Sequence, residues 1–484
     1  MERQEIPFLS VAALARHLEK KEVSPVEVTE AYLERIEALD GRLYAFLTVC
    51  HNEALQAARE AEQAIARGQY RGPLHGIPVA VKDQLHTRGI RTTGGSPIFK
   101  DFVPDEDATV IAKLKDAGAV LLGKLNMTEF ATTGFSHQFS VPRNPWDLER
   151  YTGGSSSGSG AATAAFLCAT SLGEDTGGSI RFPAAWCGVV GLRPSWGRVS
   201  RYGLMPGVWS MDTIGPLVRS VEDCAVTLEV IAGYDPKDPY TWNVPVPRYT
   251  QALADGIKGV RVGVVREQLD SDLVEPGVHQ AVLQAIEVLR ELGAVVEDVS
   301  IPLSVHAWAI SGGLRVEAPM RYRELVRSRL QEIGHDNRIG YLTGSVLPAQ
   351  VYYKAQKLRS LLRQQVLQTL EKVNVLVQPT AGRVAQKIEP DPTVDSKEKT
   401  NRLSWLLTTT YSLANIPALS MPCGFLAPAS ERPGKELPIA LQIAGRPFAE
   451  VTVLKVAYAY EQQTTWHRQR PPWPAGVVRV RSPG

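Results

Sequence analysis

Short apolar segments alternate with helical patterns along much of this chain of 484 residues. The pattern predicts strands at residues 77–81, 119–122, 257–264 and 294–300, and helices at residues 107–116 and 275–292. Such alternation favours an α/β fold, in which a sheet with many parallel strands is covered by helices on both faces. In these sheets reactive groups gather beyond the carboxyl ends of the strands, where we expect a functional site.

The chain is expected to have three parts in sequence. Ser10 is placed to cap one helix near the start, and Ser24, followed by proline, to begin another that packs outside the core. The predicted parts are a helical segment packing on the core at residues 1–66, the α/β domain at residues 67–470 with a helical cap insertion at residues 301–372, and a tail at residues 471–484.

The composition is that of a globular enzyme and argues against several other classes of protein. A hydrophobic content of 44% with 21% charged residues is ordinary for a globular enzyme, and a net charge of +2 gives no strong field for nucleic acid or anionic lipid. The five cysteines are widely spaced without a C-x-x-C pair, which argues against a disulfide framework or a zinc site. The first residues contain no basic region followed by an apolar core, and no window of 18 apolar residues occurs in the sequence. We therefore expect a soluble cytoplasmic protein.

Two serines and one lysine carry the chemistry that we expect. Two Gly-Gly-Ser sequences end at Ser155 and Ser179, 24 residues apart, and Lys82 ends the predicted strand at residues 77–81. A serine hydroxyl is a poor nucleophile until a base takes its proton. Burial behind the apolar strand would disfavour the charged form of Lys82 and lower its pKa, so that the amine could serve as this base. A hydrolase is therefore the leading interpretation.

The segment at residues 173–183 is predicted to be a glycine-containing turn around Ser179. Such a turn exposes successive backbone N–H groups on one side, and these donors can surround an oxyanion that develops beside the nucleophile. A purely structural interpretation is an ordinary turn in which Asp175 and Arg181 form a local ion pair. The stretch around Ser155 also has a structural alternative, because serines commonly cap helices.

A different catalytic serine is an alternative. Residues 154–158 match the G-x-S-x-G elbow, in which Ser156 would be the nucleophile and an Asp and a His would follow. The downstream candidates are His279, which falls in a helical pattern, and His467, which falls near the end of the chain. Neither lies after an evident strand, so this alternative is the weaker one.

Three sequence motifs in order together resemble the amidase signature family. They are Gly-Ile-Pro-Val-Ala-Val-Lys-Asp at residues 76–83, Gly-Gly-Ser-Ser-Ser-Gly-Ser-Gly at residues 153–160, and Asp-Thr-Gly-Gly-Ser-Ile-Arg-Phe-Pro-Ala at residues 175–184. The likeness covers about residues 8–225 and resumes at residues 375–380, 416–424 and 441–448. Three ordered motifs with this spacing between the serines are highly specific.

The resemblance implies a Ser-Ser-Lys triad in a single three-layer α/β/α domain with a large mixed, largely parallel central sheet. By this likeness Ser179 is the nucleophile, Ser155 is a bridging serine held by a cis peptide, and Lys82 is the base. The oxyanion would be bound by backbone N–H groups of Thr176, Gly177, Gly178 and Ser179. The reaction would convert an amide and water into an acid and an amine through an acyl-enzyme, without a metal or an organic cofactor.

One position at which this chain differs from similar glutamine-hydrolysing proteins indicates which amide it hydrolyses. The glutamine-hydrolysing subunit of bacterial tRNA amidotransferases carries an acidic residue before a Leu-Leu/Thr-Thr run, whereas here Trp405 precedes residues 406–409. An indole cannot pair with a substrate ammonium as a carboxylate does, but it can cover an apolar or aromatic group. We therefore expect an amidase for an apolar or aryl amide, or for an ester or carbamate; the alternative is the glutamine-hydrolysing subunit of an aminoacyl-tRNA amidotransferase.

The predicted substrate pocket follows from the same expectation. Its candidate lining residues are Met127, Phe135, Phe139 and Trp405. The expected partner is a small-molecule amide, with no direct contact to nucleic acid and none to a membrane, and with a homodimer as one option for the assembly.

Overall fold

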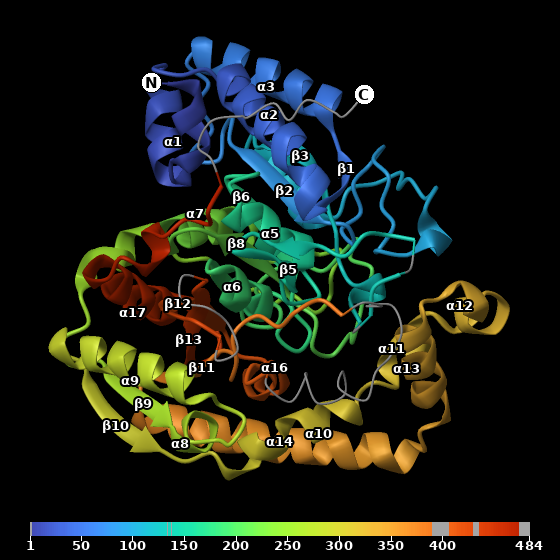
Figure 1. Ribbon diagram of the computed structural model, residues 1–484, viewed down its shortest axis with the longest axis vertical. Helices are drawn as coiled ribbons and strands as arrows, with labels where there is room; N and C mark the ends of the chain where they lie inside the picture. Colours follow the sequence, from blue (N-terminus) through green and yellow to red (C-terminus); the bar gives the residue numbers. More distant parts are fainter. Residues whose placement is uncertain (1, 133, 137, 390–405, 429–434, 474–484) are drawn as a thin grey trace.

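An 11-stranded sheet runs through the described part of the molecule (Figure 1). The computed structural model describes residues 2–132, 134–136, 138–389, 406–428 and 435–473. In spatial order the strands are β1 (Phe46–Val49), β3 (Val120–Leu125), β2 (Pro78–Lys82), β6 (Thr170–Glu174), β8 (Ile214–Val218), β7 (Val190–Arg193), β12 (Ala418–Leu426), β13 (Leu437–Gly445), β11 (Val375–Pro379), β9 (Arg261–Val265) and β10 (Val295–Val299). A separate ribbon pairs β4 (Arg143–Asn144) with β5 (Asp147–Tyr151).

The sheet is mixed, as predicted, but its share of parallel pairs is smaller than expected. Among the described strands, β3, β2 and β6 pair in parallel, as do β11, β9 and β10. The six remaining pairings are antiparallel, so the expectation of a largely parallel sheet is wrong. The reason is that β8 lies between β6 and β7 and runs against both, while the consecutive strands β12 and β13 pair directly with each other. The order of helices and strands along the chain does not reveal that β8 lies between β6 and β7 or that β12 pairs with β13.

Helices surround the sheet, with α2 and α3 at one end of the molecule and α10 and α14 at the other (Figure 1). The α-helices are α1 (Val11–Glu19), α2 (Pro25–Leu43), α3 (His51–Ala66), α4 (Thr109–Asp116), α5 (Ser157–Ala164), α6 (Arg181–Cys187), α7 (Val221–Ile231), α8 (Arg266–Leu269), α9 (Pro276–Glu291), α10 (Ala307–Gly312), α11 (Glu317–Arg321), α12 (Arg323–Ser328), α13 (His335–Val346), α14 (Ala349–Lys372), α16 (Thr409–Ala414) and α17 (Glu450–Gln463). The 3-10 segments are η1 (Arg3–Phe8), η2 (Pro97–Phe99), η3 (Glu129–Ala131), η4 (Tyr249–Asp255), η5 (Pro302–His306), η6 (Leu330–Glu332) and η8 (Trp466–Arg468). None of the helices in the described ranges combines the length and the apolar composition that crossing a membrane requires.

The two predicted helix starts near the N-terminus are confirmed. The Ser10 hydroxyl accepts the backbone N–H of Ala13 at the start of α1. At the start of α2, Ser24 and Glu27 each accept the other's backbone N–H, which is a capping box. The first 66 residues also contain β1, which the helical prediction did not include. Its Phe-Leu-Thr-Val sequence suits a strand, and it adds to the edge of the sheet beside β3.

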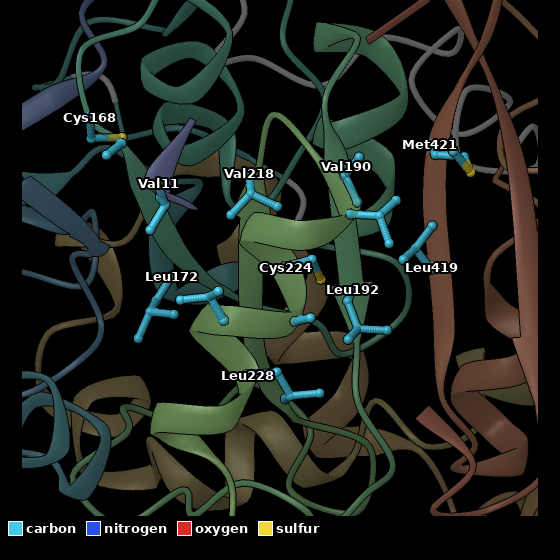
Figure 2. Packing of buried hydrophobic residues seen from close by; sticks show 14 of the residues in the cluster. Val11, Cys168, Leu172, Val190, Leu192, Val218, Cys224, Leu228, Leu419 and Met421 are labelled. Atoms are coloured by element: carbon cyan, nitrogen blue, oxygen red, sulfur yellow. The ribbon is translucent and has the colours of Figure 1, made fainter. Parts of the chain in front are cut away.

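Helices cover both faces of the sheet, which is shown most directly at β7. A Cβ placed on Gly191 would meet Ala184 of α6, so this side of β7 faces α6. The neighbouring side chains of Val190 and Leu192 point to the other face, because side chains alternate along a strand. There Leu192 lies with Cys224 and Leu228 of α7 in one buried apolar cluster (Figure 2). The arrangement α6, sheet, α7 confirms the three-layer α/β/α prediction.

Residues 301–372 are largely helical, as the sequence indicates. Part of this segment packs on a loop of the core through aromatic rings: the centroids of Phe130 and Tyr322 lie 4.7 Å apart, and those of Tyr322 and Tyr341 lie 5.9 Å apart. A buried polar contact accompanies them, because the Asn337 amide donates to the Glu129 carboxylate at 3.1 Å. The division of the chain into a core domain, a cap over the site and a tail stays a prediction.

Candidate active site

Lys82 is the last residue of β2 and is fully buried. Its Nζ lies 2.7 Å from the Ser155 Oγ, 3.1 Å from the Glu174 Oε2 and 3.4 Å from the Glu174 carbonyl oxygen. Burial lowers the pKa of Lys82 because the charged form loses its hydration, although the nearby Glu174 opposes this shift. The structure therefore presents a desolvated amine in contact with a serine hydroxyl, as the sequence predicted.

The two serine loops meet beside this amine. Ser155 is buried and follows a cis peptide bond from Gly154, just before α5 begins. Ser179 is half-buried and lies just before α6, and its carbonyl oxygen accepts the backbone N–H of Ser156 at 3.2 Å. Lys82 and the loops of Ser155 and Ser179 are thus brought together. Among the described residues the hydroxyls of Ser155 and Ser179 share no hydrogen bond, so the second step of a proton relay stays a prediction.

The turn before α6 presents backbone donors without internal acceptors. Within the described part of the chain, the N–H groups of residues 176–179 donate to no protein oxygen. The turn is held from behind, because the Thr408 hydroxyl donates to the Gly177 carbonyl oxygen at 2.6 Å. Free N–H groups that point from a fixed turn are the arrangement that stabilises a developing oxyanion.

A buried ion pair fixes both ends of this turn. The Asp175 carboxylate accepts from the Arg181 guanidinium through two contacts of 3.0 Å and from Arg193 at 3.2 Å. Burial opposes ionisation here, but the two arginines hold the pKa of Asp175 well below its ordinary value. The local ion pair of the structural interpretation is therefore present. Because it braces the turn around Ser179, it is compatible with a catalytic role of that turn.

Gly178 is the glycine of this turn that cannot be replaced without moving the backbone. Its φ is +139°, and an added Cβ would lie 2.1 Å from the Thr408 Oγ1. We expect Gly178→Ala to lower the rate of amide hydrolysis by about 10²–10³-fold, the cost of losing one oxyanion donor.

The rate and the melting temperature of Gly178→Ala should be measured together with those of Gly177→Ala. An added Cβ at Gly177 meets nothing within 4 Å, so this control should keep the wild-type melting temperature. A wild-type rate in Gly178→Ala would show that the close packing at this glycine does not set the geometry of the turn.

Two carboxyl groups near the site were missed by the sequence reasoning. Glu174 ends β6, the parallel neighbour of β2, and contacts Lys82 directly. Asp212 lies in a loop before β8 and accepts the Thr176 hydroxyl at 2.6 Å. An acidic residue at the end of an otherwise uncharged strand, directly before the glycine turn, was a usable signal for Glu174. Nothing in the local sequence of Asp212 indicates its place in the site.

The predicted pocket residues have different positions. Met127 is buried next to Thr128, whose backbone N–H donates to the Ser155 carbonyl oxygen at 3.2 Å, so it lies along the chain beside the site. Phe135 is buried and Phe139 is half-buried. Trp405 lies outside the described residues. The roles of these four residues in a pocket stay predictions.

The alternative elbow with Ser156 as nucleophile is not formed. The Ser156 hydroxyl is buried and donates to the Glu174 carbonyl oxygen at 3.1 Å, which gives it a structural task between the loop and β6. Of the candidate histidines, His279 contacts Asp270 at 3.0 Å and His467 contacts Arg468 at 3.4 Å. No described contact joins either histidine to Ser156.

Relatives with similar sequences are known. The chain is 43% identical to a glutamyl-tRNA(Gln) amidotransferase subunit of Moorella thermoacetica, over 96% of this chain and 99% of that protein. It is 42% identical to the corresponding subunit of Geobacter metallireducens, over 96% of this chain and 98% of that protein. These relatives are subunits of a larger assembly, an amidotransferase. The expectation that the chain has only a small-molecule amide as partner is therefore wrong.

Solved structures with the same fold include two informative ones. The corresponding glutamyl-tRNA(Gln) amidotransferase subunit of Thermotoga maritima superposes with a TM-score of 0.80 at 34% identity, covering 95% of both chains. A bacterial aryl acylamidase of the amidase signature family superposes with a TM-score of 0.87 at 25% identity, covering 96% of this chain and 99% of that one. The Amidase family model matches residues 27–454. With this match and this shared fold, the chain belongs to the amidase signature family of enzymes, which hydrolyse the C–N bonds of amides.

Proposed function

We propose that this chain is the amide-hydrolysing subunit of an aminoacyl-tRNA amidotransferase, and that it releases ammonia from glutamine for use by its partner subunits. The observation that carries the proposal is the 43% identity to the Moorella thermoacetica glutamyl-tRNA(Gln) amidotransferase subunit, which extends over 96% of this chain. The match includes nearly the whole length of that relative, 99%, so it is not confined to the catalytic motifs.

The proposed reaction proceeds through an acyl-enzyme on Ser179. The neutral amine of Lys82 takes a proton from the Ser155 hydroxyl, to which it lies within 2.7 Å. Ser155 in turn takes the proton of Ser179, whose oxygen attacks the amide carbonyl carbon. The tetrahedral oxyanion is stabilised by the backbone N–H groups of residues 176–179, which donate to no other described residue. The proton returns along the same path to the departing ammonia, and water then repeats the sequence to release the acid.

Trp405 is the residue that argues against glutamine. By the resemblance to the glutamine-hydrolysing subunits, an acidic residue is expected at this point of the motif to pair with the ammonium group of the substrate, and an indole offers no such charge. Recognition of the glutamine ammonium would then fall to another carboxylate of this chain or of a partner subunit. The experiment must therefore include substrates that contain no ammonium group.

We expect glutamine hydrolysis to depend on partner subunits. The purified chain should hydrolyse glutamine slowly, and the rate should rise when the other amidotransferase subunits of its own organism are added and co-purify with it. Ammonia release is the measurement, with Ser179→Ala in the same assembly as the control for contaminating glutaminase. Rapid release of p-nitroaniline from an acyl-anilide by the chain alone, without glutaminase activity in the mixture, would contradict the proposal.

A further inference from the structure

Glu174 is a fully buried carboxyl group whose two oxygens have different partners. Its Oε2 lies 3.1 Å from the Lys82 Nζ and 3.4 Å from the Gln84 Nε2, both of which are nitrogen donors. Its Oε1 lies 2.8 Å from the Thr176 Oγ1. One oxygen therefore faces donors only, whereas the other faces a hydroxyl that can either donate or accept.

Counting hydrogens at Thr176 places a proton on this carboxyl group. The Thr176 hydroxyl has one hydrogen, yet its oxygen lies within hydrogen-bond distance of two carboxyl oxygens, Glu174 Oε1 at 2.8 Å and Asp212 Oδ1 at 2.6 Å. If both carboxyl groups were ionised, one of these contacts would hold no hydrogen. Asp212 also accepts the backbone N–H groups of Gly207 on Oδ2 at 2.8 Å and of Val208 on Oδ1 at 2.9 Å, so each of its oxygens already faces an N–H donor. The extra proton therefore belongs on the Glu174 Oε1.

The contacts of Lys82 fit this assignment. A neutral amine has two hydrogens and one lone pair, and the Lys82 Nζ has three neighbours. Two of them, the Oε2 and the carbonyl oxygen of Glu174, can only accept when the acid proton is on Oε1. The third, the Ser155 hydroxyl at 2.7 Å, can donate to the lone pair. An ammonium could donate to all three oxygens, but it has no lone pair with which to accept the Ser155 proton, so the proposed role as base requires the neutral amine.

The electrostatics of the pair agree with this count. Burial raises the pKa of Glu174, and burial lowers the pKa of Lys82. Both shifts favour the neutral forms, because two separated charges lose more hydration in the interior than their attraction returns. Among the described residues, the other titratable or charged groups that act on the pair are Asp175, Asp212, Arg193 and Tyr322. Of these Arg193 is engaged by Asp175, so it does not act as a free cation beside Glu174.

We propose that Glu174 holds, as a neutral carboxylic acid in the resting enzyme, the proton that Lys82 would otherwise carry. This makes Glu174 a positioning residue that keeps the Lys82 amine neutral and aims its lone pair at Ser155. The inference rests on the proposed role of Lys82 as base. No bond of Glu174 breaks during turnover: Lys82 gains the Ser155 proton and returns it through Ser155 to the departing ammonia, while the Glu174 O–H bond persists.

Glu174→Gln tests the inference because an amide reproduces the neutral acid. Its NH₂ group can donate to Thr176 and its oxygen can accept from Lys82 and Gln84, but it carries no negative charge at any pH. The readout is the rate at which a sulfonyl fluoride modifies Ser179, followed by mass spectrometry across pH, which needs neither the natural substrate nor partner subunits. We expect the Glu174→Gln rate within about tenfold of wild type, and its acid limb within about half a pH unit.

The alternatives give different results. If Glu174 were ionised beside a Lys82 ammonium, removing its charge would lower the pKa of Lys82 and move the acid limb to lower pH by a unit or more. That shift, or loss of labelling in a folded Glu174→Gln variant, would overturn the inference. Glu174→Ala is the matched variant without a donor or an acceptor, and we expect it to lose labelling by about 10²-fold; wild-type labelling there would show that Glu174 positions nothing.

An infrared measurement separates this inference from the proposed function. The wild-type spectrum should contain the C=O stretch of a protonated carboxylic acid that shifts in D₂O and is absent from Glu174→Gln. The difference spectrum cancels other buried acids, such as Glu461, whose pKa burial raises to about 8. Failure of wild-type Ser179 to react would refute the triad and leave this readout intact. A difference spectrum without the band would refute the protonation of Glu174 even if the triad stands.

Discussion

Ser179→Ala should lower amide hydrolysis by roughly 10⁶-fold, the loss seen when a catalytic serine is removed from a serine hydrolase. Without the hydroxyl no acyl-enzyme can form, and only the backbone donors of residues 176–179 remain to stabilise an attacking water. The fold should survive, because the contact that Ser179 makes to Ser156 uses its carbonyl oxygen, which alanine retains. The measurements are the rate on the active substrate and the mass of the trapped acyl-enzyme.

Ser156→Ala is the matched control for Ser179→Ala. The Ser156 hydroxyl binds the backbone of Glu174, so its removal should cost about 1–3 kcal/mol of unfolding free energy and leave acylation of Ser179 possible. If Ser156→Ala abolished acylation while Ser179→Ala preserved it, the nucleophile would be misassigned and the elbow interpretation would return.

Lys82→Met should lower the rate at neutral pH by about 10⁴-fold, at the upper end of what a general base contributes. Methionine fills much of the buried space of lysine without offering a base. The pH profile carries the sharper test. Since burial lowers the pKa of Lys82, the wild-type amine stays neutral below the ordinary lysine range, and activity is lost as the pH falls through this lowered pKa. The residual activity of Lys82→Met should lack this acid limb.

Lys113→Met is a suitable control for Lys82→Met. The pKa of Lys113 is also lowered by burial, but its ammonium contacts the Ala232 carbonyl oxygen at 2.7 Å, on the side of α4 that packs against α7. We expect this variant to keep both the rate and the acid limb. An acid limb that persists in Lys82→Met would mean that a different group accepts the Ser155 proton.

The sequence was sufficient for the parts of the site that are contiguous in the chain. Lys82 was placed at the carboxyl end of a strand because an apolar run ends there, and the turn before Ser179 was recognisable from its glycines. Contacts between neighbouring strands were not accessible in this way. Glu174 reaches Lys82 because β6 lies beside β2 with Val81 opposite Leu172, and this register is set by the whole sheet.

The same limit applies to the aromatic residues. The position of Phe135 and Phe139 in a polar loop suggests a pocket mouth, whereas the structure shows Phe130 joining a core loop to the helical insertion. Its partners Tyr322 and Tyr341 are about 200 residues away in sequence, and burial of these rings depends on how the insertion folds back. The residues next to Phe130 in the sequence therefore do not predict its contacts with Tyr322 and Tyr341.

Arg181 has a consequence for the order in which the site can form. Besides Asp175, its guanidinium donates to the Thr408 carbonyl oxygen, the Ser412 hydroxyl and the Gln442 side chain, all from the last fifth of the chain. A ribosome makes the serine loops long before these acceptors. A nascent or truncated chain that ends before Thr408 keeps the pairing with Asp175 but lacks these three C-terminal acceptors for Arg181, so we expect premature fragments to be unable to consume the amide.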